Sequence, residues 1–390
     1  MTLAYAANVF PSETLAEVLT SLDGPLAEVK RAVSPEAPLA IELRLGEEAA
    51  REVDTVPDAR EALRRTIADG GFVVRTINGF PQRAFHGAPV KENVYRPTWL
   101  EPERAAYTIA LARVLASLLP EGAGGSVSTA PGSFKAFGHG PKVLAGVADS
   151  LARTASALAD LRRSTGKSVS LLLEPEPGCT LATAGEVIAF WKEFLAPRFD
   201  TAPRIRPHLG VTIDIGHLAV EFEDACAAAK RLAAAGIPIG KIHATSAVAV
   251  KRPAGNRAAL ARLAALSNSP YLHQAVGADA TGRVIFREMD LPEVLAAPSR
   301  LAGVDELRVH FHLPLFMDTF GPLGTTRSET LGAVPHLVNE GLCDMTVLET
   351  YTWDVLREQP EFTGMTVAEG VAREWAWAKK NLMTDGKSSR

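Results

Sequence analysis

The stretch His208–Asp224 of this 390-residue chain reads HLGVTIDIGHLAVEFED, and it decides the expected fold. It begins with Leu209–Ile213, a short apolar run rich in β-branched residues, which predicts a buried strand. Asp214 and His217 follow where the run ends, and Asp224 then opens an Ala-rich helix. A strand that delivers an acid and an imidazole into the loop before a helix is typical of the active-site end of a parallel barrel.

Strand and helix patterns alternate along the first two thirds of the chain. Seven strands are expected, at Leu3–Val9, Leu39–Leu45, Phe72–Ile77, Gly125–Thr129, Val169–Leu173, Leu209–Ile213 and Lys241–Ser246. A helical pattern follows at least the first six of them, which predicts a parallel sheet. Seven or eight such units in about 250 residues favour a closed (β/α)₈ barrel. An open, nucleotide-binding sheet is disfavoured because no glycine-rich phosphate fingerprint follows any of these strands.

Two segments compete for the eighth place in the barrel. We assign Thr346–Glu349 as the eighth strand and interpret residues 248–324 as an elaboration of the seventh unit, including a β-hairpin that turns near Asp279–Gly282. The alternative places residues 307–313 in the barrel instead. A capping box at Thr366–Glu369 opens a final helix over about residues 367–383. We expect residues 1–390 to form a single barrel domain that carries this elaboration.

Composition and charge exclude several classes of partner. The net charge is −4 and no basic block is present, so nucleic acid is not an expected partner. Three cysteines lie far apart and form no CxxC pair, which suits a reducing compartment. The N-terminal segment lacks the basic residues and apolar run of a signal peptide, and no stretch is apolar for long enough to span a bilayer. We expect a cytoplasmic protein without membrane insertion.

Acidic and imidazole side chains stand at the ends of the last four expected barrel strands. They are Glu174, Asp214, His243 and Glu349. In a barrel these strand ends converge on one face, so the four side chains form a mixed nitrogen and oxygen site. Such a site suits a divalent ion such as Mn²⁺, Mg²⁺, Co²⁺ or Zn²⁺. Carboxylates brought inward by apolar strands would be costly to bury without a cation or another partner.

Several further polar residues have either a structural or a functional role. His217 either packs as an ordinary buried histidine, or it binds substrate or orients a ligand. His310 and His312 share one face of their strand because side chains alternate, and either a substrate contact or a structural role fits them. Glu176 is expected to support Glu174 or to be a loop residue. The remaining candidates lie in loops, where a polar side chain is usually just solvated: His86, Lys135, His139 and Trp353.

The ordered motifs EPEPG, DIGH, KIHATS and VLETYTW resemble the xylose isomerase-like TIM barrels, which include sugar isomerases, ketose epimerases, inosose dehydratases and endonuclease-IV-type nucleases. A narrower resemblance, to the EboE family of metabolite traffic proteins, rests on TINGFP, KENVYRP, STAPGSFK, LEPEPGC, AVEFED, YLHQ, VHFHLP, FGPLGTT and ETYTWDVL. These motifs run along nearly the whole chain. The narrower resemblance implies work with other ebo-cluster proteins in making or moving a secondary metabolite.

The wider resemblance implies roles for individual residues. It makes Glu174, Asp214, His243 and Glu349 the metal ligands, and it gives the two glutamates the exchange of a proton with the carbon next to the substrate carbonyl. His217 would contact substrate oxygens, and further substrate contacts are expected from His86, Lys135, His312 and Trp353. The expected activity is that of a metal-dependent isomerase, epimerase or related lyase acting on a polyol, sugar or cyclitol. The alternative is a barrel that binds a metabolite or a partner protein without turnover. A role in DNA repair is disfavoured because TING and STAP stand where the multi-zinc nucleases need histidines.

Overall fold

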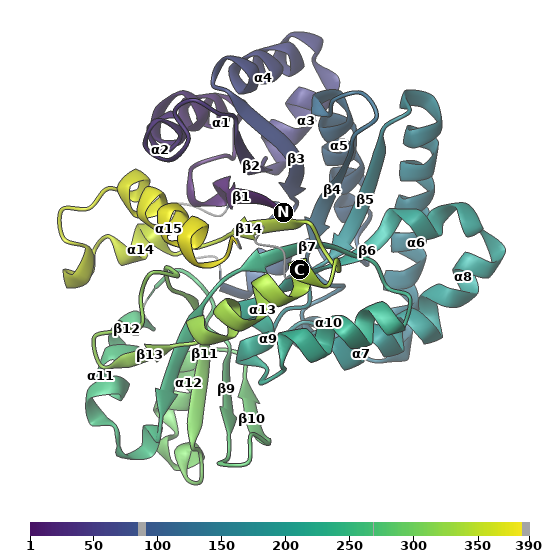
Figure 1. Cartoon of the computed structure of the whole chain (residues 1–390). Helices are drawn as coiled ribbons and strands as arrows, with labels where there is room; N and C mark the ends of the chain where they lie inside the picture. Colours follow the sequence, from purple (N-terminus) through teal and green to yellow (C-terminus); the bar gives the residue numbers. More distant parts are fainter. Residues whose placement is uncertain (85–90, 268, 384–390) are drawn as a thin grey trace, which may run out of the picture.

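The computed structural model of the chain describes residues 1–84, 91–267 and 269–383. Eight of its strands are parallel to their barrel neighbours: β1 (Thr2–Ala6), β2 (Leu39–Arg44), β3 (Phe72–Asn78), β4 (Gly124–Thr129), β5 (Ser168–Leu173), β6 (Leu209–Asp214), β7 (Ile239–Ala244) and β14 (Met345–Leu348). They close into a barrel in the order β1, β14, β7, β6, β5, β4, β3, β2 (Figure 1). The predicted (β/α)₈ barrel is confirmed, and β14 fills the eighth place between β1 and β7.

Helices follow the barrel strands and pack around their outer side (Figure 1). Their bounds are α1 (Leu15–Ser21), α2 (Ala27–Val33), α3 (Glu47–Thr55), α4 (Pro57–Asp69), α5 (Pro102–Leu118), α6 (Pro141–Thr165), α7 (Ala184–Phe190), α8 (Ala196–Thr201), α9 (Ile215–Val220), α10 (Ala225–Ala234), α11 (Arg257–Leu266), α12 (Leu291–Ala296), α13 (Arg327–Asn339), α14 (Trp353–Leu356) and α15 (Val367–Asn381). In the described part of the chain, none of these helices has the length and apolar character needed to cross a bilayer.

The stretch His208–Asp224 contains strand β6, helix α9 and Asp224, the residue that caps α10. The side-chain oxygen of Asp214 accepts from the backbone N–H of His217 and so caps α9, while Asp224 caps α10 in the same way by accepting from Ala227 N. The six-residue helix α9 was not predicted. It turns the chain directly above the barrel mouth, and it therefore holds His217 beside Asp214 instead of releasing it into a loop.

A second sheet separates β7 from α13 and β14 in the sequence. It consists of β8 (Ala247–Lys251), β9 (Ala275–Ala278), β10 (Val284–Glu288), β11 (Glu306–His312), β12 (Thr319–Phe320) and β13 (Leu323–Thr325). The sheet order is β10, β9, β11, β8, β13, β12, and this sheet lies to one side of the barrel, with α11 and α12 close by (Figure 1). The predicted hairpin is present as the antiparallel pair β9–β10.

The predicted elaboration over residues 248–324 contains further strands beside the predicted hairpin. Strand β11, the alternative candidate for the eighth barrel strand, pairs antiparallel with both β8 and β9. It cannot also belong to the parallel barrel, because both of its edges are already occupied. Strand β8 was not predicted; its apolar run follows β7 after only two residues.

The inside of the barrel holds a charged pair and several hydroxyl groups. Lys241 and Glu42 are both fully buried there, with an ion pair between Nζ and Oε1. The Lys241 Nζ also donates to Ser128 Oγ at 2.9 Å, and Thr76 Oγ1 donates to Glu42 Oε1 at 3.3 Å. This polar layer lies directly beneath the residues at the carboxyl end of the strands, because His243 follows Lys241 by two positions on the same face of β7.

Candidate metal centre and substrate pocket

Four buried side chains meet where four neighbouring barrel strands end. Glu174 follows β5, Asp214 ends β6, His243 lies in β7 and Glu349 follows β14. One ligand atom from each residue lies within 4.8 Å of those of the other three. The structure therefore brings together the four residues that the sequence predicted as metal ligands. They meet because consecutive strands of a closed parallel barrel deliver their ends to the same face.

Three carboxylates surround the Nδ1 atom of a single imidazole. This atom of His243 lies 2.7 Å from Glu174 Oε1, 3.3 Å from Glu349 Oε2 and 3.7 Å from Asp214 Oδ2. Within the described residues, Asp214 Oδ2 is buried and has no hydrogen-bond partner. A buried carboxylate oxygen without a partner is costly. A divalent cation bound by three carboxylates and one imidazole would satisfy it, so the residues present fit such an ion.

The pKa values at this centre reflect crowded negative charge. Burial alone would lower the pKa of His243, but Glu174, Glu349 and Glu42 raise it well above its ordinary value. Burial alone would raise the pKa of Glu349, yet the nearby His243 lowers it. The site thus attracts positive charge strongly, either as a proton on His243 or as a bound cation in its place.

A second layer of side chains fixes the orientation of His243. Its Nε2 lies 3.1 Å from Glu42 Oε2, so the imidazole donates to that carboxylate and presents Nδ1 to the centre. Burial would raise the pKa of Glu42, but Lys241 and His243 lower it to about 2. An ionised carboxylate behind a metal-binding histidine fixes its tautomer and increases its basicity. The sequence analysis missed Glu42 and Lys241, although a glutamate inside the apolar run LAIELRL was a usable signal.

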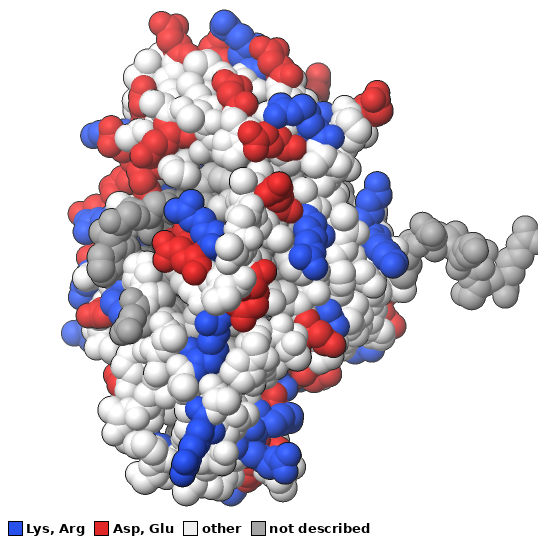
Figure 2. Space-filling model, turned by 90° about the vertical axis from the view of Figure 1, so that its left-hand side faces the viewer, with Lys and Arg blue, Asp and Glu red and all other residues white. Residues whose placement is uncertain are grey.

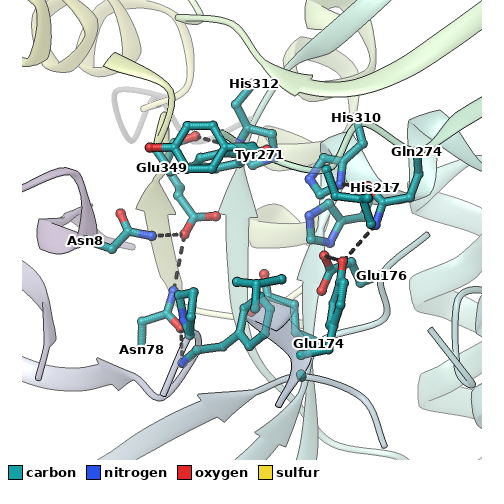
Figure 3. Close-up of a pocket in the computed structure, with 17 residues that line it drawn as sticks. Asn8, Asn78, Glu174, Glu176, His217, Tyr271, Gln274, His310, His312 and Glu349 are labelled. Carbon is teal, nitrogen blue, oxygen red and sulfur yellow. Dashed lines mark hydrogen bonds between the residues drawn. The ribbon is translucent and has the colours of Figure 1, made fainter. Parts of the chain in front are cut away.

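Amides and hydroxyls hold the acidic ligands in place. Asn8 Nδ2 donates to Glu349 Oε1 at 2.7 Å, and Asn78 Nδ2 donates to the same oxygen at 3.2 Å (Figure 3). Thr245 Oγ1 donates to Asp214 Oδ1 at 2.6 Å. The sequence analysis missed the two asparagines as well. Asn78 is the last residue of β3, so the rule that polar strand ends face the site would have found it.

A pocket opens above the centre. Its lining mixes polar and apolar side chains: Asn8, Asn78, Phe80, Pro81, Val94, Tyr95, Ala130, Glu174, Glu176, His217, Tyr271, Leu272, Gln274, His310, His312, Glu349 and Tyr351. Figure 3 shows Glu349 and Glu174 at opposite sides of this space, with the histidines above them. Gln274, His310 and His312 come from the second sheet or the loop before it, so the elaboration contributes directly to the pocket.

The residues predicted to contact substrate differ in whether their side chains line the pocket. His217 and His312 line the pocket. Lys135 does not, because its Nζ forms an ion pair with Glu186 Oε1 at 2.8 Å. Trp353 is buried in the core, where its Nε1 donates to the hydroxyl of Tyr5 at 3.1 Å. Direct substrate contact is therefore not supported for Lys135 or Trp353. His86 lies outside the described residues.

A hydrogen-bonded chain connects the pocket wall to the second sheet. The hydroxyl of Tyr95 donates to Glu176 Oε1 at 2.5 Å, and Gln274 Nε2 donates to that hydroxyl at 2.7 Å (Figure 3). Burial, with added repulsion from Glu174 and Asp214, raises the pKa of Glu176 to about 7. Glu176 is thus more than the loop residue that the sequence also allowed. It lines the pocket, and Tyr95 and Gln274 are partners that the sequence analysis missed.

Positive and negative side chains are mixed on one face of the molecule (Figure 2). On the face in Figure 2, lysines and arginines are interspersed with aspartates and glutamates among the coloured residues. The net charge of the sequence is −4. This face therefore lacks the continuous basic patch that binds a phosphate backbone.

No protein-family profile and no curated protein matches the chain. Solved structures are similar to it. A xylose isomerase-like TIM barrel protein from Mycobacterium smegmatis, in complex with magnesium, is similar over 97% of this chain and 98% of its own, with 12% identity and a TM-score of 0.50. The fold of this chain is thus a TIM barrel similar to that protein's. A xylose isomerase domain protein from Planctomyces limnophilus covers 98% of this chain and 97% of its own, at 12% identity and TM-score 0.47. The IOLI protein with a bound zinc atom covers 98% and 100%, at 12% identity and TM-score 0.44.

Proposed function

We propose that the protein is a metal-dependent isomerase, epimerase or related lyase that acts on a polyol, sugar or cyclitol. The observation that carries this proposal is the convergence of Glu174, Asp214, His243 and Glu349 beneath the pocket. Two of these side chains, Glu174 and Glu349, also line the pocket and can therefore reach a bound substrate. Proton transfer next to a carbonyl needs two such carboxyl groups, one to remove the proton and one to return it.

The chain supplies a base and a second carboxyl group that faces the same space. Asn8 and Asn78 donate to one oxygen of Glu349 and stabilise its ionised form, which suits a base. Glu174 faces the same space and would carry the proton back to the carbon. Phe80, Pro81 and Val94 give the same pocket an apolar wall against which the carbon skeleton of a substrate can pack. A divalent ion held by the four residues would polarise the carbonyl of the substrate.

The narrower motif resemblance supports a more specific setting. We propose that the enzyme serves an ebo-type secondary-metabolite pathway in the cytoplasm, together with other ebo-cluster proteins. The support for this setting is the run of EboE-like motifs, seven of which contribute residues to the pocket: TINGFP, KENVYRP, STAPGSFK, LEPEPGC, YLHQ, VHFHLP and ETYTWDVL.

The test is exchange of hydrogen with solvent. Protein loaded with Mn²⁺, Mg²⁺, Co²⁺ or Zn²⁺ is incubated in D₂O with a panel of ketoses and inososes, and deuterium at the carbon next to the carbonyl is measured by mass spectrometry. We expect exchange with at least one substrate and its loss in Glu174→Gln and in Glu349→Gln. Glu340→Gln, at an exposed helix end, is the matched control and should retain exchange.

Metal binding decides between catalysis and simple binding. Folded protein with no affinity for any of these ions would refute the proposal. Protein that binds an ion and raises its melting temperature with a panel compound, but never exchanges deuterium, would instead support the alternative of a non-catalytic metabolite-binding barrel.

A further inference from the structure

Three buried imidazoles meet next to the four-residue centre but are not part of it. His217 comes from α9, and His310 and His312 come from β11 of the second sheet. One ring nitrogen from each lies within 4.8 Å of those of the other two. The ring centroids are 4.5 Å apart for His217 and His310, 5.2 Å for His310 and His312, and 5.7 Å for His217 and His312. The three rings therefore form a cluster at the pocket wall (Figure 3).

Each ring has its Nδ1 atom next to an oxygen that can only accept. The Nδ1 of His217 lies 3.0 Å from the carbonyl oxygen of Pro175, and that of His312 lies 3.2 Å from the carbonyl oxygen of Glu349. The Nδ1 of His310 lies 2.9 Å from Gln274 Oε1. In neutral rings Nδ1 must then carry the hydrogen, so Nε2 keeps its lone pair.

The orientation of the Gln274 amide is fixed independently. Its Nε2 donates to the carbonyl oxygen of Pro177 at 2.9 Å, and a carbonyl oxygen cannot donate. Its Oε1 must therefore face His310 and accept from it. Outer hydrogen bonds of this kind, from a histidine to a carbonyl, set the tautomer of metal-binding histidines in many proteins.

The Nε2 atoms of the three rings lack good hydrogen-bond partners. Within the described residues, the Nε2 atoms of His310 and His312 are buried and have no hydrogen-bond partner. The Nε2 of His217 lies 4.0 Å from Asp214 Oδ2, which is too far for a hydrogen bond. Burial lowers the pKa of His310 well below its usual value and that of His312 to about 4, so both rings are neutral near pH 7. Unpartnered buried nitrogens are costly and call for a ligand.

We propose that His217, His310 and His312 hold a second divalent cation of the zinc class. Three imidazole nitrogens with one position left open form a common zinc site, and imidazole also selects zinc over magnesium or manganese. Zinc–nitrogen bonds of about 2.0 Å place the nitrogens about 3.4 Å apart, so the rings, which offer nitrogens within 4.8 Å of one another, would move closer together on binding the ion.

This site differs from the four-residue centre in charge and in the ion it favours. The four-residue centre has three carboxylates and suits a hard cation, whereas the three histidines bring no charge. The free Oδ2 of Asp214 lies between the two sites, near both His243 and His217. Because the cluster and Glu349 line the same pocket, the open position of the second ion faces the substrate space.

The test counts zinc ions in untagged protein. Protein stripped with a chelator is reloaded with Zn²⁺, freed of excess metal by gel filtration and analysed by mass spectrometry. We expect two zinc ions per chain in the wild type and one in the double variant His310→Gln/His312→Gln. Glu174→Ala should also leave one, because it weakens only the four-residue centre. The matched control is His336→Gln, which changes a partly exposed histidine on α13 and should keep two zinc ions.

A measurement on the wild type removes any dependence on how the variants fold. An anomalous-difference map at the zinc edge, from crystals of reloaded protein, should show a peak bonded to the three Nε2 atoms. A single zinc per chain, located at the four-residue centre and unchanged in the double variant, would overturn the second site while leaving the proposed function intact. Zinc bound at the three histidines alone would support the second site and would leave the proposed function to the same measurement with Mn²⁺, Mg²⁺ and Co²⁺ at the four-residue centre.

Discussion

Lys241→Met tests the buried pair beneath the metal centre. The side chains of Lys241 and Glu42 are both 0% exposed, and the substitution leaves the carboxylate buried without its cation. The folded state holds the pKa of Glu42 at about 2, against an ordinary value of 4.5, because Lys241 and His243 outweigh the effect of burial. This difference corresponds to about 3 kcal/mol at about 1.36 kcal/mol per pKa unit. Breaking a buried pair by removing one partner costs a similar amount, about 3–5 kcal/mol.

The sign of the pH dependence follows from the lowered pKa. The contribution of Glu42 to the free energy of unfolding is complete above pH 4.5 and is lost as the pH falls towards about 2. Measurements at pH 7 therefore contain the whole effect. We expect Lys241→Met to lower the free energy of unfolding by about 3 kcal/mol. The double variant Glu42→Gln/Lys241→Met should lose less, because no unpaired charge remains buried.

The assay is urea unfolding of chelator-treated protein, so that bound metal does not add stability. Circular dichroism and the fluorescence of the five tryptophans must give coincident transitions before a free energy is derived. The control is Lys251→Met, which removes an ion pair with Glu306. Because the Lys251 side chain is 66% exposed, this substitution should lower the free energy of unfolding by less than about 1 kcal/mol. The reasoning is refuted if Lys241→Met costs no more than this control, or if the double variant is less stable than Lys241→Met.

Three further predictions concern other parts of the molecule. Burial raises the pKa of Glu374 from 4.5 to about 7, so the folded protein favours the protonated side chain. The free energy of unfolding should therefore fall by about 3 kcal/mol as the pH rises from below 4.5 to above 7. Glu374→Gln should flatten this slope in unfolding curves measured across that range, and an unchanged slope would contradict the assignment. Gly370→Ala should lower the melting temperature, because the added Cβ would lie 2.4 Å from the ring of Trp353, at a cost of about 1–3 kcal/mol. Gly332→Ala, on a helix with open space around it, is the matched control and should raise the melting temperature slightly. Asn8→Ala should weaken Mn²⁺ or Zn²⁺ binding about tenfold or more in calorimetry by freeing Glu349, and an unchanged affinity would show that this amide does not position the ligand.

The rule that polar residues at the ends of barrel strands face the site carried most of the site prediction. It predicted that Glu174, Asp214, His243 and Glu349 share one face, because parallel barrel strands all end at the same rim. It was applied only to the last four strands, so Asn78 at the end of β3 was overlooked. It also could not rank loop residues, and Lys135 and Trp353 were included although their side chains are engaged elsewhere.

The sequence by itself determined the barrel, the four converging strand ends and the presence of extra structure after β7. These features depend on local periodicity and on the order of strands along the chain, which a sequence displays directly. Only the tertiary structure decided that β11 joins a second sheet and turns His310 and His312 towards His217. The same is true of Glu42 and Lys241, which are 199 residues apart in the chain. Contacts at such separations depend on barrel closure and on which sheet a strand joins, and no local pattern encodes either of them.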